Sequence, residues 1–325
     1  MRELTLAQAV TDGLTEVMSK YDNALIFGQD VGRNGGVFRI TDGLQEKFGE
    51  KRVFDTPLAE SGILGITVGL ADEGFLPLPE IQFSGFILEA MDALAANITR
   101  MRFRYGNTRS APITIRAPYG GGVRTPELHS DSLEGMFAQI PGLRIVVPTT
   151  AYDAKGLYIA AAESPDPVLF LEHLRLYRTV KGDVPEGYYT VDLDKAAVAR
   201  EGSDITLVGY GLMTVLALQA AEKLAEQGVS AEVIDLRTIA PVDYETITQS
   251  VAKTNRVVVL QESQRQAGIV GQIAGEIQER NFMDLDAPVG RVTAPDTVFP
   301  FGLAESVWMP DVDDIVEQTL STLNY

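Results

Sequence analysis

The chain has 325 residues, of which 45% are hydrophobic and 22% charged, and its formal net charge is −18. This composition is typical of a globular protein with room for two domains, and the acidic balance leaves no basic footprint for nucleic acid. The absence of cysteine excludes disulfides and thiolate sites, and two histidines, His129 and His173, are too few for a histidine-rich metal site.

The apolar segments of the chain are short. No run approaches the roughly 18 apolar residues that a membrane span needs, and the first residues are too polar for a signal peptide. We therefore expect a cytoplasmic location in a prokaryote, or a chain whose targeting segment was removed, with no membrane partner. The acidic excess suits a basic protein partner, although solubility alone explains most of these charges.

Strands and helices are predicted to alternate from the N-terminus to residue 180. Apolar residues at helical spacing predict helices, and short buried runs predict strands. This alternation indicates a parallel sheet with helices on both faces. The predicted helices cover 4–18, 41–48, 86–104 and 151–162, with one more from residue 60, and the predicted strands cover 23–30, 53–54, 75–83, 112–117, 143–148 and 167–172.

A second alternating series follows a stretch rich in glycine, proline and acids. We predict a first domain over 1–180, a linker over 181–194 and a second domain over 195–325, both doubly wound α/β domains. The second series has predicted strands over 205–209, 231–236, 256–261 and 289–293, and predicted helices over 214–227, 243–252, 269–280 and 311–323.

Glu60 lies where a loop becomes a glycine-rich, apolar helix. The unpaired amides at a helix start favour an ionised carboxylate, whereas apolar surroundings favour a protonated one. A carboxyl group under these opposite influences is a candidate for chemistry. The alternative is an ordinary capping acid in the first turn of the helix.

Polar and aromatic residues gather where the first-domain strands are predicted to end, which is where ligands bind in open α/β sheets. No dinucleotide fingerprint, phosphate-binding P-loop or serine nucleophile elbow is present. The remaining candidates are a carboxyl group, a histidine after a glycine loop, and nearby polar and aromatic side chains, namely Glu60, His129, Asp30, Gln82, Phe83 and Phe86.

Five ordered motifs resemble the beta chain of the decarboxylating component of 2-oxo acid dehydrogenase complexes, most of all that of Gram-positive bacteria. They are DTPLAESG at 55–62, EIQFSGF at 80–86, RAPYGGG at 116–122, HSDSLEG at 129–135 and PGLRIVVP at 141–148. PVD from residue 241 and ESVW from residue 305 fit the same family's C-terminal domain. The resemblance covers the whole chain and implies a thiamine-pyrimidine-binding first domain and a transketolase-like second domain.

The resemblance implies thiamine diphosphate as the cofactor. Glu60 matches the family's acid that hydrogen-bonds the pyrimidine and drives it to the imino form, which deprotonates the thiazolium ring; a raised pKa is expected for that role. Phe86 matches the aromatic residue that stacks on the pyrimidine, with a core aromatic as the alternative, and Leu58 and Gln82 match other cofactor-lining positions. His129 matches the histidine that handles protons or orients the substrate and the lipoyl group, with a capping or core role as the alternative, whereas His173 is interpreted as structural or interfacial.

The same resemblance implies two metal ions. The family suggests a potassium ion held mainly by backbone oxygens, with a structural loop as the alternative, at positions that match Ile113, Ala161, Ala162, Ser164 and Asp166. The family also holds the diphosphate through Mg²⁺ bound by a GDG segment and a later asparagine. That pair is absent from this chain, so we expect an alpha chain to supply the Mg²⁺ site.

The resemblance implies an α₂β₂ heterotetramer that decarboxylates a 2-oxo acid and passes the acyl group to lipoyl-lysine of a dihydrolipoyl acyltransferase. Pyruvate is the expected 2-oxo acid. The acyltransferase contributes a lipoyl domain and a subunit-binding domain, which is typically basic. Acids of the second domain suited to that contact are Glu276, Glu279, Asp284 and Asp286. The alternatives are a branched-chain 2-oxo acid or acetoin dehydrogenase beta chain and, from a different class, a non-catalytic flavin- or nucleotide-binding electron-transfer subunit.

Overall fold

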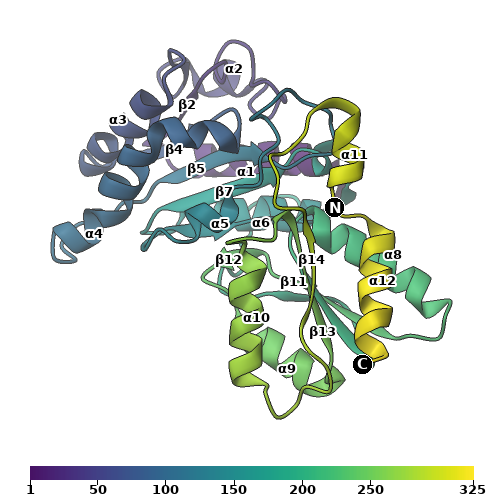
Figure 1. Cartoon of the computed structure of the whole chain (residues 1–325). Helices are drawn as coiled ribbons and strands as arrows, with labels where there is room; N and C mark the ends of the chain where they lie inside the picture. The colour runs from purple at the N-terminus through teal and green to yellow at the C-terminus, as the bar shows by residue number, and fades with distance from the viewer.

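A seven-stranded sheet forms the centre of the first domain in the computed structural model, which describes residues 1–325 (Figure 1). Its strand order is β12-β6-β7-β5-β4-β2-β3, and all neighbours are parallel except β12, which joins the edge antiparallel to β6. The strands are β2 (Ala24–Gly28), β3 (Val53–Asp55), β4 (Leu76–Glu80), β5 (Thr114–Tyr119), β6 (Arg144–Val146), β7 (Val168–His173) and β12 (Thr238–Ala240).

Both faces of this sheet are buried, as the apolar strands predict. In β2, Ala24 and Ile26 belong to one hydrophobic core, while Leu25 and Phe27 belong to the other, because successive side chains of a strand point to opposite faces. Helices α1 (Leu6–Lys20) and α6 (Ala151–Ala162) pack together on the first face. The other helices of the domain are α2 (Leu44–Phe48), α3 (Glu60–Asp72), α4 (Met101–Arg104), α5 (Glu134–Phe137) and α7 (Leu176–Thr179).

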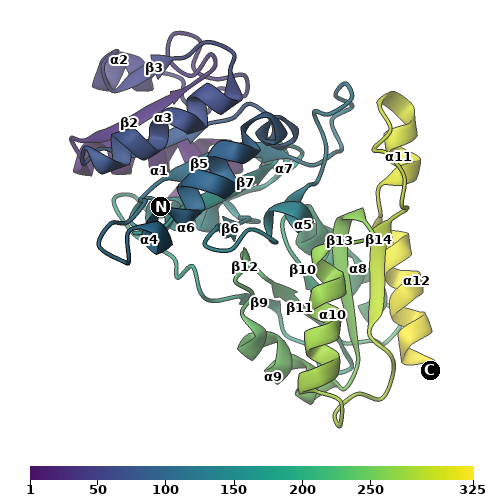
Figure 2. The same cartoon turned by 60° about the vertical axis from the view of Figure 1, so that its left-hand side comes forward.

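The second domain repeats this design around a five-stranded sheet in the order β14-β13-β10-β11-β9, in which only β9 is antiparallel to its neighbour (Figure 2). None of the helices in either domain has the length and apolar content that crossing a bilayer requires. The elements are β9 (Ala197–Arg200), β10 (Ile205–Gly209), β11 (Ala231–Asp235), β13 (Val257–Gln264), β14 (Gly290–Ala294), α8 (Leu212–Ala225), α9 (Tyr244–Thr254), α10 (Ile269–Arg280), α11 (Glu305–Trp308) and α12 (Val312–Leu323).

The segment predicted as a long helix over 86–104 is helical throughout, but it is not a regular α-helix. It consists of a 3₁₀-helix over Ser84–Ala90, a π-helix over Asp92–Asn97, a 3₁₀-helix over Ile98–Arg100 and the short α4. Side chains donate hydrogen bonds to main-chain carbonyls in this segment. Asn97 Nδ2 donates to the Asp92 carbonyl at 3.2 Å, and Arg100 Nε donates to the Ala95 carbonyl at 3.0 Å. Such bonds compete with the regular helical pattern.

Two strand pairings cross the predicted domain boundaries. Residues Lys181–Val184, predicted as the start of the linker, form β8, which pairs antiparallel with β1 (Arg2–Thr5). The strand β12, from the second half of the chain, completes the first sheet. The division into 1–180, 181–194 and 195–325 therefore stays a prediction.

Candidate active site

The connections of the first sheet reverse direction between the neighbouring strands β2 and β4. The chain leaves β2 towards β3 on one side and leaves β4 towards β5 on the other. In open α/β sheets a ligand-binding crevice forms at such a point, outside the carboxyl ends of the strands. Asp30 and Gln82 follow these two strands and meet there, where Gln82 Nε2 donates a hydrogen bond to Asp30 Oδ2 at 3.2 Å.

Glu60 begins α3 just after β3, the other neighbour of β2. The residue is 8% exposed. The N-cap of α3 is Ala59 and no side chain caps the helix, so Glu60 is not a capping acid. Its carboxyl group makes no side-chain hydrogen bond or ion pair within the chain, in contrast to those of Asp30, Asp55 and Asp72 nearby in the sequence. Its oxygens are not sealed inside the core, since neither is among the fully buried atoms without a partner. In its protonated form this carboxyl group fits a ligand that offers a hydrogen-bond acceptor, such as a ring nitrogen of a pyrimidine.

Three aromatic rings line the next part of the site. The ring of His129 lies 4.5 Å from that of Phe83 and 5.0 Å from that of Phe86, and the two phenylalanine rings are 5.6 Å apart. His129 is half-buried, and its Nδ1 lies 2.8 Å from the Glu127 carbonyl. The structure thus brings His129 to Phe86 across 43 positions of sequence, while Leu58 stays 69% exposed in the loop before α3.

The sheet beneath these groups contains a fully buried charge network. Arg116 donates to both oxygens of Glu172, at 2.6 and 2.7 Å, and to Glu80 at 2.7 Å. Tyr177 Oη donates to Glu172. Burial raises the pKa of Glu80 more than the nearby Arg116 lowers it. Sequence reasoning missed this network, although charged residues inside strands predicted as buried were a signal.

A second buried cluster joins the two domains. His173 Nε2 lies 2.6 Å from Glu262 Oε2 of the second domain, and the histidine is 1% exposed. The other oxygen of Glu262 accepts bonds from the Gly121 amide at 2.7 Å and from Ser132 Oγ at 3.0 Å. Burial raises the pKa of Glu262, but His173 and these hydrogen bonds outweigh it, so that the pKa is lowered.

The residues that match a potassium site come together at the end of α6 and before β5. The carbonyl of Ile113 accepts from the Val168 amide at 2.9 Å, and the carbonyl of Ala161 accepts from the Ser164 amide at 3.1 Å. Ser164 Oγ donates to the Asp166 carbonyl at 2.8 Å. Each of these oxygens therefore already has one partner, although a carbonyl has two lone pairs.

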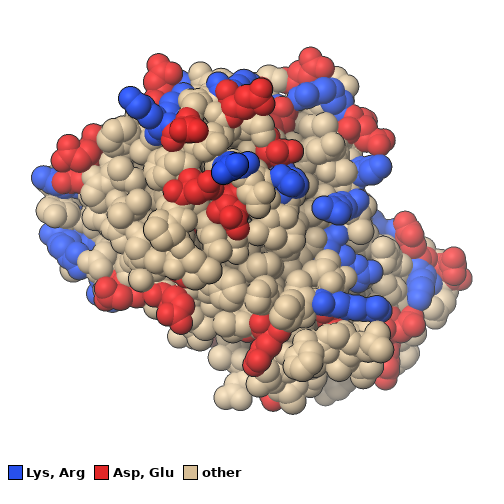
Figure 3. Space-filling model, turned by 90° about the horizontal axis from the view of Figure 1, so that it is seen from above, with Lys and Arg blue, Asp and Glu red and all other residues tan.

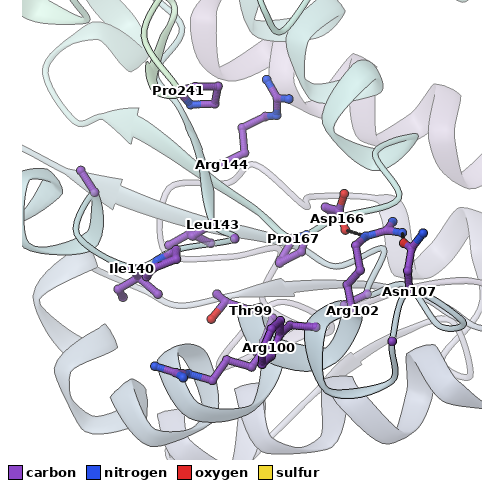
Figure 4. A pocket seen from close by; sticks show the side chains of 17 residues that line it. Thr99, Arg100, Arg102, Asn107, Ile140, Leu143, Arg144, Asp166, Pro167 and Pro241 are labelled. Carbon is purple, nitrogen blue, oxygen red and sulfur yellow. Dashed lines mark hydrogen bonds and ion pairs between the residues drawn. The ribbon is translucent and has the colours of Figure 1, made fainter.

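The Asp166 side chain points away from this turn, into a cleft of about 1060 Å³ beside Pro167 (Figure 4). There its carboxylate accepts a hydrogen bond from Arg102. This cleft lies at the amino ends of β5, β6 and β7, whereas Gln82 follows the carboxyl end of β4. No group of three or more His, Asp or Glu side chains is arranged to hold a metal ion.

Comparisons with known proteins agree with the site geometry. Residues 2–180 match the transketolase pyrimidine-binding domain, and residues 194–315 match the transketolase C-terminal domain. The chain is 54% identical over 325 residues to the pyruvate dehydrogenase E1 component subunit beta of Staphylococcus aureus and to that of Staphylococcus epidermidis, with 100% of each chain covered. The chain belongs to the family of these E1 beta subunits. The family resemblance seen in the motifs is thereby confirmed, and an electron-transfer subunit is not supported.

A solved structure of a split-gene transketolase, an inactive beta4 tetramer, has the same fold. It superposes with a TM-score of 0.79 and 23% identity, covering 99% of this chain and 98% of that one. This likeness concerns the fold alone and confirms the two α/β domains. In this family the pyrimidine-binding domain implies dependence on thiamine diphosphate, which the partnerless carboxyl group of Glu60 fits.

Proposed function

We propose that this chain is the beta subunit of a pyruvate dehydrogenase, which decarboxylates pyruvate oxidatively and passes the acetyl group to lipoyl-lysine of a dihydrolipoyl acyltransferase. The observation that carries the proposal is the buried Glu60 carboxyl group, which has no partner in its own chain and begins α3 beside the switch point of a pyrimidine-binding domain. The names of the relatives support pyruvate as the substrate.

The residues of this chain would act on the pyrimidine half of the cofactor. Thiamine diphosphate, when bound, would supply the nucleophilic carbon that decarboxylation of a 2-oxo acid needs. Glu60 would share a proton with the pyrimidine ring, Phe86 would stack on it, and Gln82 and Leu58 would line it. His129, in contact with Phe83 and Phe86, would face the substrate and the lipoyl group.

The diphosphate and Mg²⁺ would be held by an alpha chain in an α₂β₂ heterotetramer. The face seen in Figure 3 supports a large protein contact, because it has a broad area without charged side chains. Exposed apolar side chains also precede and follow the start of α11, where Leu303 is 73% and Val307 89% exposed. Unpartnered apolar surface of this kind marks protein interfaces.

The contact with the acyltransferase is proposed at the end of α10. Glu279 is exposed there without an ion-pair partner, whereas Glu276 pairs with Arg280 at 2.9 Å and Asp286 pairs with Arg256 at 3.2 Å. The neighbouring Phe282 and Met283, 66% and 89% exposed, add apolar surface. A basic subunit-binding domain should therefore bind less tightly as salt is raised, and binding that salt leaves unchanged would contradict this contact.

The potassium ion and the cytoplasmic location stay proposals. The ion would be held by the second lone pairs of the carbonyls of Ile113, Ala161, Ala162, Ser164 and Asp166. Thermal unfolding of the heterotetramer in potassium chloride and in choline chloride at equal ionic strength tests the site. A higher melting temperature in potassium is the expected result, and equal melting temperatures would contradict the site.

The function is tested by co-expressing this chain with the alpha chain from the same operon or genome. We expect release of CO₂ from pyruvate only when both chains and thiamine diphosphate are present. The same assay with a branched-chain 2-oxo acid, and acyl transfer to a lipoyl domain measured with acetoin, which has no carboxylate to release as CO₂, distinguish the nearer alternatives. Turnover of either of these substrates in preference to pyruvate would overturn the proposed substrate, and no turnover of any would overturn the proposed enzyme.

A further inference from the structure

The second domain has a switch point of its own, between β10 and β13. The chain leaves β10 towards β11 on one side and leaves β13 towards β14 on the other. Side chains at this point hold a segment of the first domain. Tyr210, which follows β10, donates to Glu134 Oε1 at 2.7 Å, and Glu262, on β13, accepts from the Gly121 amide at 2.7 Å.

One oxygen of Glu262 accepts hydrogen bonds from both ends of a loop and so holds these ends together. Its Oε1 accepts from the Gly121 amide at 2.7 Å and from Ser132 Oγ at 3.0 Å. Residues 122–131, between these two contacts, form no helix or strand and carry His129. The other oxygen of Glu262 is held by His173 at 2.6 Å, and Glu262 is only 2% exposed. Charge-assisted hydrogen bonds of this kind are strong and directional.

The closed loop is under local strain. Arg124 and Leu128 both have a left-handed backbone, with φ of 59° and 68°, which costs energy for residues other than glycine. A second carboxylate from the second domain holds the strained part: Glu305 accepts from the amides of Gly122 and Arg124. Strained conformations persist only where their surroundings hold them, so the shape of this loop depends on the second domain.

We propose that Glu262 is a positioning residue for His129: by joining Gly121 to Ser132 it closes the base of the loop that carries the histidine against Phe83 and Phe86. The second domain, which contributes none of the expected cofactor-binding residues, thereby controls the geometry of the site in the first. The catalytic consequence rests on the proposed function, whereas the closure of the loop does not.

The test uses the α₂β₂ complex with Glu262→Gln and Ser132→Ala, and Glu222→Gln as the matched control on an exposed residue of α8. Glutamine offers one acceptor oxygen and cannot serve both the loop and His173, and alanine removes one of the two closing bonds. We expect amide hydrogen exchange of residues 122–131 to become about tenfold faster or more in both variants, the size of a lost charged hydrogen bond. Ser132→Thr, which keeps the hydroxyl group, should restore slow exchange.

A merely structural role would not reproduce the expected kinetic pattern. The kcat for acetyl transfer to a lipoyl domain should fall in proportion to the faster loop exchange, while the Kd for thiamine diphosphate and exchange elsewhere stay as in Glu222→Gln. Unchanged exchange of the loop in folded Ser132→Ala would overturn the closure. A loosened loop with unchanged kcat, or a parallel loss of cofactor affinity, would overturn the positioning role. A wild-type complex without pyruvate decarboxylation would refute the proposed function, while the exchange measurement would still decide the closure.

Discussion

The two domains share the strand order of a four-stranded core, β5-β4-β2-β3 in the first and β14-β13-β10-β11 in the second, but use their switch points differently. In the first domain the point between β2 and β4 is lined by Gln82 and Asp30, with the partnerless Glu60 at the start of α3 beside it. In the second domain the equivalent point is filled by first-domain residues, held by Tyr210 and Glu262. The proposed ligand would bind at the first point, whereas a segment of the chain itself fills the second.

This difference indicates why a ligand-binding fold occurs twice in a chain with one expected site. Open α/β sheets leave amides and polar side chains free at the carboxyl ends of their strands. In the second domain the polar side chain of Glu262 at this position is hydrogen-bonded by a backbone amide of the glycine loop, that of Gly121. A switch point therefore identifies a place for binding, and only the side chains show whether the occupant is a ligand or another part of the protein.

The largest expected effect is a loss of enzyme activity when Glu60, beside the first switch point, is changed. Glu60→Gln should lower pyruvate decarboxylation by the α₂β₂ complex by about 10²–10⁴-fold, because the amide cannot exchange a proton as a general acid must. Glu73→Gln, at an exposed position after α3, is the control and should retain activity. Near-normal decarboxylation by a folded Glu60→Gln complex would remove Glu60 from the site.

The charge network under the first switch point should dominate stability. Arg116→Ala leaves Glu80 and Glu172 buried without a cation and should lower the free energy of unfolding by about 3–5 kcal/mol. The exposed pair of Arg109 with Asp72 is the matched control, and Arg109→Ala should cost at most about 1 kcal/mol. Denaturant unfolding measures the free energy of unfolding of both variants. Equal losses in the two would show that the buried network stabilises the fold no more than an exposed ion pair does.

The second switch point should give a pH dependence. Burial, only partly offset by the hydrogen bond from Tyr210, raises the pKa of Glu134 from 4.5 to about 7. Between these values the unfolded chain loses a proton that the folded chain keeps, so folding stability falls as the pH rises. The contribution amounts to about 3 kcal/mol at 1.36 kcal/mol per unit.

Glu134→Gln keeps an oxygen for Tyr210 and removes the titration. Urea unfolding of the variant and the wild type from pH 5 to 8 should therefore diverge, with the variant gaining relative stability as the pH rises. Parallel curves would mean that Glu134 does not titrate in this range in the folded protein.

The smallest expected effect concerns the aromatic wall of the first site. Phe86→Ala should weaken thiamine diphosphate binding to the complex by about two- to tenfold, as expected for the loss of one aromatic stacking contact of about 0.5–1.5 kcal/mol. Phe103→Ala, which truncates a side chain that is 88% exposed, is the control. Equal affinities of the two variants in calorimetric titrations would leave Phe86 as a core aromatic residue.

Local patterns predicted most of the elements. The helices over Ala151–Ala162 and Ile269–Arg280 have the predicted bounds, because helical spacing of apolar residues is a local property. The helix predicted over 86–104 is present but irregular, because side chains such as that of Asn97 bind nearby carbonyls. The strand Thr238–Ala240 was missed because its partner, β6, lies almost a hundred positions earlier.

The candidate site was predictable in part for the same reason. Glu60, Gln82 and Phe86 lie in motifs of a few residues each, so their resemblance to a known family is visible in the sequence. The closure of the His129 loop was not, since Glu262 is 141 positions from Gly121 and the segment around it has no distinctive pattern. Contacts of this range depend on how two domains pack and leave no local periodicity.

One measurement tests the contrast between the two switch points most directly. Amide hydrogen exchange of the α₂β₂ complex, with and without thiamine diphosphate and Mg²⁺, should show cofactor-dependent protection in residues 28–32, 58–63 and 80–86. Residues 209–213 and 260–264 should be protected to the same degree in both states, because first-domain residues already fill that point. Protection gained in the second set and not in the first would contradict the account.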